Sequence, residues 1–137
     1  MNIGLCDSRR TILIIDDDAH ARAALHIALE GAGFSVAEAA NDLEGERTIK
    51  RCKIDAVLFD PIAGTTHSGP TITERLHASG STLACYIIST AAEALMGSVG
   101  LHELGISGIF LKPLDTKVVI RTLKTRLYAT EVAGGDA

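Results

Sequence analysis

Five short apolar runs alternate with segments of helical character along the chain, and this alternation constrains the fold more than any other feature. The predicted strands are residues 11–15, 34–39, 54–59, 83–89 and 108–111. A first helix is predicted after the capping residue Asp18, a second is capped by Asn41 or Asp42, and a third begins at Pro70. Two more helices are predicted over Ala91–Leu104 and about Thr116–Tyr128. Strands joined by helices form right-handed crossovers, so we expect an α/β protein whose five-stranded parallel sheet is flanked by five helices.

Length and composition favour a single domain and exclude several functional classes. The chain has 137 residues, and 47% of them are apolar, which is enough to bury a core. We expect one domain over residues 1–137, with a core at about 10–128 and a loose tail at 129–137. The net charge of −4 disfavours direct binding of nucleic acid. No apolar run is long enough for membrane insertion, and three scattered cysteines fit a cytoplasmic location.

Polar residues follow four of the five predicted strands. These are Asp16 and Asp17 after the first strand, Asp60 after the third, Thr90 after the fourth and Lys112 after the fifth. The carboxyl ends of parallel strands meet at one edge of the sheet, so we expect these side chains on a common rim. Each residue alone also has a simpler explanation, because an aspartate after a strand is commonly a solvated strand end or a helix cap.

The expected rim carries the groups that phosphoryl transfer needs. Carboxylate oxygens are suitable ligands for Mg²⁺, and a cation would offset the repulsion among the aspartates of the stretch TILIIDDDAH. Asp60 could then act as a nucleophile toward phosphorus. Charge on the transferring group would be met by the Lys112 ammonium, the Thr90 hydroxyl and a backbone N–H near Ala91.

Four segments carry a resemblance to a known family. ILIIDDD, DAVLFD, YIISTA and GISGIFLKPL follow one another at the spacing of the receiver domains of bacterial two-component response regulators. The chain resembles these domains over about residues 10–128. The resemblance implies a flavodoxin-like (βα)5 fold with strand order 2-1-3-4-5. It also implies a phosphoacceptor that takes part in its own phosphoryl transfer and dephosphorylation, and not an enzyme with a separate substrate.

The resemblance implies a metal set and a phosphoacceptor. Asp60 matches the aspartate that becomes phosphorylated. Mg²⁺ or Mn²⁺ would be held by Asp16, Asp17, Asp60 and the backbone carbonyl of Ile62. Within this set Asp17 is expected to bind the metal directly and Asp16 through water.

Further positions match the family's switch residues. Thr90 matches the switch hydroxyl, Lys112 matches the phosphate-binding lysine, whose peptide bond to Pro113 is often cis in relatives, and Ala91 supplies a backbone N–H to the phosphoryl group. Ile109 departs from the pattern, because relatives usually carry an aromatic residue there. Phe110 should point to the opposite face of the strand and cannot replace it. The aromatic swing that accompanies phosphorylation in relatives is therefore not expected at Ile109.

The resemblance also implies partners. A sensor histidine kinase or a histidine phosphotransfer protein would donate the phosphoryl group. The response to phosphorylation would be transmitted by the face made by the fourth helix, the fifth strand and the fifth helix. This face would bind a protein target that the sequence does not identify. The last predicted helix carries Lys117, Arg121, Lys124 and Arg126. We favour a solvated face for these cations over a partner-docking or homodimer face.

Two other functions are compatible with parts of the sequence. Ile109 and the unusual loop after Asp60 would suit a degenerate receiver that binds proteins independently of phosphorylation. A phosphatase of the haloacid dehalogenase type is a third reading, because Asp16 and Asp18 satisfy its Asp-x-Asp pattern. That class places Thr or Val two residues after the second aspartate, where this chain has His20.

Overall fold

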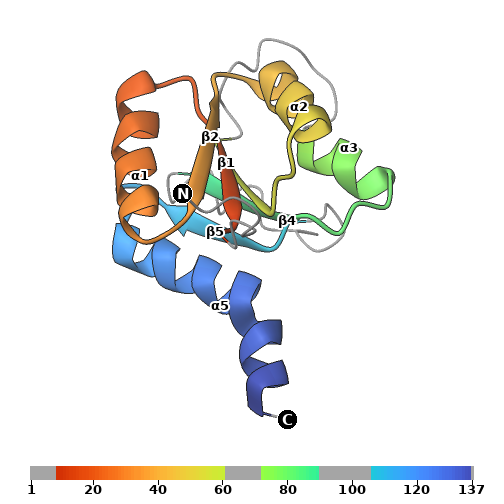
Figure 1. Ribbon diagram of the computed structural model, residues 1–137. Coiled ribbons are helices and arrows are strands. Elements are labelled where there is room, and N and C mark those ends of the chain that lie inside the picture. The colour runs from red at the N-terminus through yellow and green to blue at the C-terminus, as the bar shows by residue number, and fades with distance from the viewer. Residues whose placement is uncertain (1–8, 61–71, 90–105, 137) are drawn as a thin grey trace, which may run out of the picture.

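A computed structural model describes residues 9–60, 72–89 and 106–136, apart from the side chains at 73, 74 and 129–136. Along the chain, the elements are β1 (Thr11–Ile15), α1 (Ala19–Gly31), β2 (Ser35–Ala39), α2 (Asp42–Arg51), β3 (Ala56–Phe59), α3 (Ile72–Ala78), β4 (Ala84–Ser89), β5 (Gly108–Leu111) and α5 (Thr116–Asp136) (Figure 1). The predicted helix at Ala91–Leu104 lies outside the described residues.

The five strands form one parallel sheet in the order β2-β1-β3-β4-β5, which confirms the predicted fold class and strand order. β1 and β3 lie in its interior, because their uninterrupted apolar residues can be buried on both faces. The register pairs Ile15 with Phe59 and Phe59 with Ile87. Asp16 and Asp60 therefore leave neighbouring strands at the same level of the sheet.

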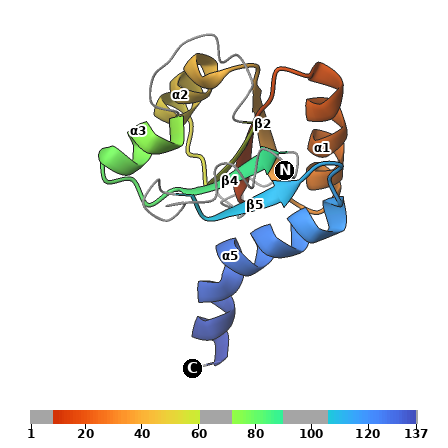
Figure 2. The ribbon, with the colours of Figure 1, turned by 180° about the vertical axis from the view of Figure 1, so that it is seen from behind.

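Two hydrophobic clusters lie on opposite faces of the sheet. Leu25 and Leu29 of α1 and Leu123 of α5 pack on one face, and Ile72 of α3 packs on the other. Figures 1 and 2 show α1 and α5 on one side of the strands and α2 and α3 on the opposite side. Burial of each Leu or Ile side chain stabilises the fold by about 1.5–3 kcal/mol, so each helix is held chiefly by its apolar face.

Side-chain caps begin three of the helices. Asp18 accepts hydrogen bonds from the backbone N–H groups of the first turn of α1, as predicted. Asn41, one of two predicted candidates, caps α2 by accepting from the backbone N–H of Glu44 at 3.0 Å. Asp42 is buried instead, and its carboxylate accepts from the backbone N–H of Ile72 at 3.3 Å, which joins α2 to α3. Asp115 accepts from the backbone of the first turn of α5.

α5 is longer than the sequence predicted. The expected end was near Tyr128, with a loose tail beyond, but the helix continues to Asp136. The segment contains no proline, and helix propagation adds one hydrogen bond for each further residue. Figures 1 and 2 show the last turns projecting beyond the sheet. No helix in the described part of the chain is both long and apolar enough to cross a membrane.

Tyr128 fixes α5 at the opposite edge of the sheet from the rim. Its ring lies 5.3 Å from the guanidinium carbon of Arg10 and 6.3 Å from the ring of Phe34. Phe34 itself donates its backbone N–H to the carbonyl of Leu29 at 3.1 Å. That bond belongs to the end of α1, so β2 begins at Ser35 and not at Phe34 as predicted.

Candidate functional site

Three charged side chains meet where β1, β3 and β5 end. The Lys112 ammonium lies 2.7 Å from Asp60 Oδ2 and 3.5 Å from Asp16 Oδ2. Both carboxylates are largely buried, with side chains 4% exposed at Asp16 and 12% at Asp60, whereas Lys112 is 32% exposed. We call Asp16, Asp60 and Lys112 the rim cluster.

Lys112 partly offsets the repulsion between two neighbouring carboxylates. Burial of its side chain disfavours the charged form, but the hydrogen bond to Asp60 and the charges of Asp60 and Asp16 outweigh that effect. The pKa of Lys112 is therefore raised above its ordinary value. The lysine therefore stays an ammonium at neutral pH.

The backbone and side chain of Asp16 are both fixed. Its N–H donates to the carbonyl of Ala39 at 3.1 Å, and its Oδ1 accepts from the N–H of Asp18 at 2.9 Å. Its carbonyl accepts from Arg22 Nη1 at 2.5 Å. The peptide that links β1 to the two following aspartates is therefore held from β2 and from α1.

The three consecutive aspartates differ in their environments. Asp16 is buried in the rim cluster, and Asp17 is exposed. Asp18 is exposed and caps α1; the N–H groups of Ala21 and His20 stabilise its carboxylate and lower its pKa. Only one of the three charges is therefore placed in a poorly hydrated position, which explains how a buried strand can end on this sequence.

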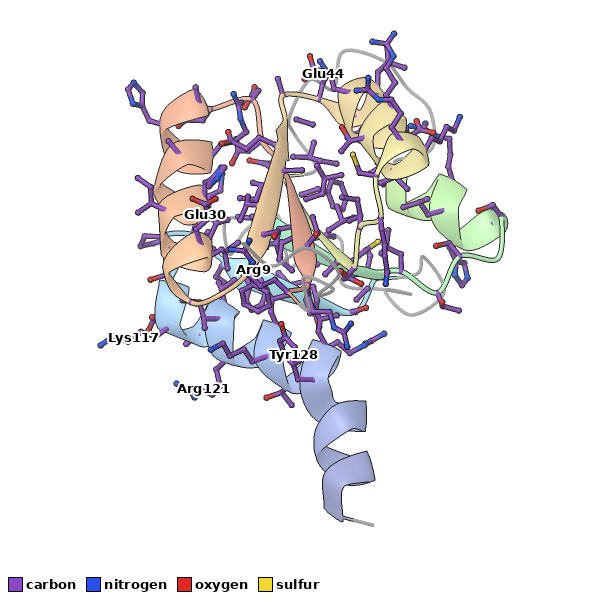
Figure 3. All side chains as sticks on the ribbon, viewed as in Figure 1. Arg9, Glu30, Glu44, Lys117, Arg121 and Tyr128 are labelled. Atoms are coloured by element: carbon purple, nitrogen blue, oxygen red, sulfur yellow. The ribbon has the colours of Figure 1, made fainter. Side chains whose placement is uncertain are left out.

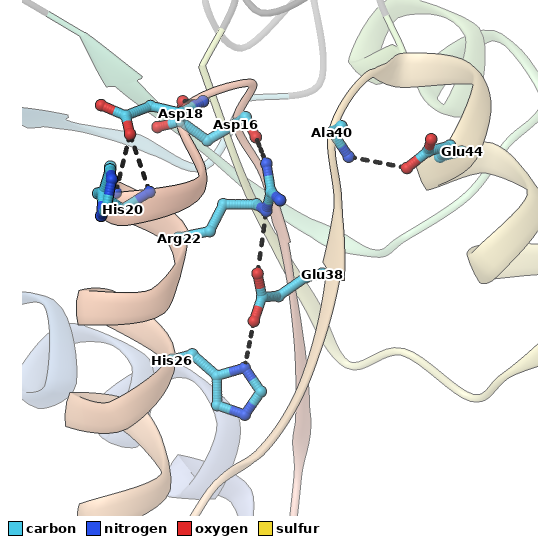
Figure 4. Close-up of polar contacts among 9 residues, drawn as sticks. Asp16, Asp18, His20, Arg22, His26, Glu38, Ala40 and Glu44 are labelled. Carbon is cyan, nitrogen blue, oxygen red and sulfur yellow. Dashed lines mark hydrogen bonds and ion pairs between the residues drawn. The ribbon is translucent and has the colours of Figure 1, made fainter.

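A second set of charged residues connects the rim to the outer side of α1 and β2. Glu38 Oε1 accepts from Arg22 Nε at 2.9 Å, and Glu38 Oε2 lies 2.6 Å from His26 Nδ1 (Figure 4). We call Arg22, His26 and Glu38 the α1–β2 network. These residues were not among the predicted site residues. The available signal was weak: a four-residue spacing between Arg22 and His26, and a single charge in the strand Ser35–Ala39.

The donor chemistry of the rim fits Mg²⁺. This ion takes oxygen ligands, usually one or two protein carboxylates, and keeps several waters. Asp16 and Asp60 provide two such carboxylates side by side. Within residues 9–60, 72–89 and 106–136, no group of three or more His, Cys, Asp or Glu side chains is assembled for a metal. Asp17 is therefore not gathered with the other two, and Ile62, the fourth predicted ligand, lies outside the described residues.

The remaining predicted residues are only partly described. Thr90 and Ala91 lie outside the described residues. Ile109 is half-buried on β5 and pairs with Ile87. Phe110 packs in the hydrophobic cluster that α1 and α5 cover, where its ring stacks on Tyr86 at 5.3 Å between centroids. It therefore points to the face of the sheet opposite Ile109, as predicted.

A cavity of about 350 Å³ adjoins the rim on the side of α1 and α5. Asp16, Asp18, Lys112 and Thr116 contribute its polar lining, and the remaining lining is mainly aliphatic. Pro113, which follows a cis peptide bond after Lys112, also borders it. The cavity leaves one side of Lys112 accessible to solvent.

Comparison with known proteins gives consistent matches. The model of the response regulator receiver domain matches residues 12–124. The phosphate regulon transcriptional regulatory protein PhoB of Pseudomonas aeruginosa is 32% identical over 130 residues, which make up 93% of this chain and 56% of that protein. The chain thus spans about half the length of this curated relative.

Solved structures agree in fold. A CheY-like response regulator receiver domain protein from Methanospirillum hungatei has 25% identity and a TM-score of 0.79, over 92% of this chain and 99% of that one. A putative response regulator from Chloroflexus aurantiacus has 26% identity and a TM-score of 0.76, over 88% and 98%. Both proteins therefore share the fold of this chain.

Proposed function

This chain belongs to the family of response regulator receiver domains, and from that premise we propose that it is a phosphorylation switch whose phosphoacceptor is Asp60. The donor is a sensor histidine kinase or a histidine phosphotransfer protein, and the reaction takes place in the cytoplasm. The observation that carries the proposal is the 2.7 Å contact between Lys112 and Asp60 beside the buried carboxylate of Asp16.

The proposed transfer uses the carboxylate of Asp60 as the nucleophile. One of its oxygens attacks the phosphorus of phosphohistidine; the O–P bond forms, the N–P bond breaks, and the electron pair stays on the imidazole nitrogen. Lys112 already contacts Asp60 and can move its ammonium to the oxygens of the arriving phosphoryl group. Because its pKa is raised, it offers a full positive charge there at neutral pH.

A divalent cation completes the proposed site. Asp17, Asp60 and the carbonyl of Ile62 would hold Mg²⁺ or Mn²⁺ directly, and Asp16 would hold it through water. When bound, the ion neutralises charge on the carboxylates and on the phosphoryl oxygens, which otherwise repel each other. The buried position of Asp16 keeps one carboxylate fixed for this purpose before any ligand arrives.

The proposed response to phosphorylation uses residues on both sides of β5. The Thr90 hydroxyl and the Ala91 N–H would contact the phosphoryl group. The output surface comprises the segment after β4, β5 and α5. Ile109 replaces the usual aromatic switch residue, and Phe110 is already packed against Tyr86 on the opposite face. We therefore propose that any switching proceeds without an aromatic swing at position 109.

Intact-protein mass spectrometry after incubation with acetyl phosphate and Mg²⁺ tests the phosphoacceptor. We expect the gain of one phosphoryl group in the wild type, no gain in Asp60→Asn, and no gain when the cation is chelated. Asp115→Asn is the matched control, because asparagine caps a helix as well as aspartate does. A wild type that stays unmodified would favour the phosphorylation-independent binding module. A gain that persists in Asp60→Asn would overturn the assignment of Asp60.

A further inference from the structure

The α1–β2 network forms a continuous path from the surface to the backbone of the acidic site. His26 contacts Glu38, Glu38 contacts Arg22, and Arg22 donates to the carbonyl of Asp16 (Figure 4). The two carboxylate oxygens of Glu38 are used separately, one by each neighbour. A change at His26 can therefore reach the rim through only two intermediate side chains.

The contacts of His26 indicate that its ring is protonated. Nδ1 lies 2.6 Å from Glu38 Oε2, and Nε2 lies 3.2 Å from Glu30 Oε2. A neutral imidazole has one N–H, and its other nitrogen can only accept a hydrogen bond. A carboxylate has no proton to donate, so both contacts are favourable together only for the imidazolium.

The charged groups around His26 support the same protonation state. Burial of the ring opposes its charge, but the hydrogen bonds and charges of Glu38 on β2 and Glu30 on α1 outweigh burial. The pKa of His26 is therefore raised above its ordinary 6.5. α5 also packs against α1, and its cations Lys117 and Arg121 are exposed and point outward from that helix (Figure 3).

Arg22 donates to the backbone carbonyl of Asp16, just beyond the end of β1. The N–H of Asp16 is bonded to β2, whereas its carbonyl lies beyond the last strand pairing and accepts from Arg22. That carbonyl belongs to the peptide that leads into Asp17. Its orientation sets where the next residue leaves the rim.

We propose that Arg22 is a positioning residue of the phosphoacceptor site and that protonated His26, acting through Glu38, keeps Arg22 in place. The inference rests on the proposed function of the rim. Loss of the proton frees one oxygen of Glu38, so that Glu38 and Arg22 can move together. The peptide between Asp16 and Asp17 then loses its fixed orientation, and phosphoryl acceptance falls as pH rises above 6.5.

Amide NMR of the full chain without divalent cations tests the link directly. From about pH 6 to about pH 8, the range in which histidine titrates, we expect the Asp17 amide to shift with the same midpoint as the His26 ring. His26→Gln and Arg22→Lys should each abolish this shift. His77→Gln, on α3, is the matched control and should retain it. An Asp17 amide that titrates equally in His26→Gln would overturn the inference.

The rate of modification by acetyl phosphate and Mg²⁺ gives a second readout. Over the same pH range, we expect the ratio of the wild-type rate to the His26→Gln rate to fall about twofold, the effect of losing one partly exposed ion pair. If the wild type is never modified while the NMR link is present, the proposed function fails and the link stands. If the wild type is modified and its rate keeps a constant ratio to that of His26→Gln, the inference fails alone.

Discussion

The rim cluster and the α1–β2 network contain similar contacts in different surroundings. Each is a set of three charged side chains, with shortest separations of 2.7 Å between Lys112 and Asp60 and 2.6 Å between His26 and Glu38. The side chains of Asp16 and Asp60 are 4% and 12% exposed, whereas Glu38 is 32% exposed. Asp16 belongs to the first set through its carboxylate and is held by the second through its carbonyl.

The difference in burial separates two roles. The two carboxylates of the rim cluster are poorly hydrated, so removing Lys112 leaves them uncompensated. The carboxylate of Glu38 in the α1–β2 network is better hydrated, so its contacts are weaker, and the network includes His26, whose pKa is raised above its ordinary value. The molecule thus keeps a fixed set of charges at the reactive position and a responsive set next to it.

The largest effect on stability is expected at the rim. Lys112→Met keeps the apolar stem of the side chain but removes the ammonium between two buried carboxylates. We expect a loss of about 2 kcal/mol in the free energy of unfolding at pH 7 without divalent cations, because solvent screens part of the repulsion. Urea denaturation measures it, with Lys117→Met on the exposed face of α5 as the control. Equal losses in both variants would show that the rim is not the more strongly coupled region.

A smaller effect is expected where the two regions meet. Arg22→Ala removes the donor to the Asp16 carbonyl and the ion pair with Glu38, and we expect a loss of about 1 kcal/mol. Arg47→Ala, at an exposed position of α2, should change stability by less than about 0.5 kcal/mol. If Arg22→Ala costs as much as Lys112→Met in urea denaturation, the proposed ranking of the two regions is wrong.

The rim could be anticipated because its geometry follows from patterns local in sequence. Each buried strand is a short apolar run that ends at a polar residue, and parallel strands place their ends on one edge. The prediction for Asp60 and Lys112 therefore needed only the positions of two strand ends. Their close contact, and the contact with Asp16, then follow from the register of β1, β3, β4 and β5.

The α1–β2 network could not be anticipated in the same way. Arg22 and Glu38 are 16 residues apart, on a helix and a neighbouring strand, and their contact depends on how α1 is rotated over β2. A surface-like histidine or glutamate gives no sign of such a rotation in one sequence. The end of α5 was predicted at about Tyr128, but the backbone stays helical to Asp136 through Gly134 and Gly135, residues of a type that commonly ends a helix.

A pH effect would distinguish the two regions. Because folding raises the pKa of His26, protonation of His26 stabilises the fold. This stabilisation is complete below pH 6.5, the ordinary pKa of histidine, and is lost as pH rises through the folded pKa. Burial of Glu38 raises its pKa, but contacts with His26 and Arg22 outweigh burial and lower it. The contribution of Glu38 to stability is therefore present above pH 4.5 and is lost as pH falls through its folded pKa.

We expect the stability difference between the wild type and His26→Gln to be largest between pH 4.5 and 6.5, at about 0.5 kcal/mol, and to decline on both sides. Urea denaturation at a series of pH values measures this difference, and His77→Gln should give no such maximum. A difference in stability that stays constant from about pH 5 to about pH 9, an interval that includes the titration of histidine, would contradict a charged His26.

Salt is expected to have the smallest effect and to act on one region only. Raising the concentration of NaCl to about 0.5 M shortens the Debye length to roughly 4 Å, which weakens interactions between hydrated charges more than those between buried ones. Salt also changes the stability of the whole fold, so the informative quantity is the difference in stability between each variant and the wild type.

For Arg22→Ala, that difference should shrink by a few tenths of a kcal/mol, about half the value of one exposed ion pair. For Lys112→Met it should stay constant, because Asp16 and Asp60 are shielded by protein and not by ions. Shrinkage of both differences to the same extent would mean that the carboxylates of the rim are as well hydrated as Glu38, and that burial does not separate the two regions.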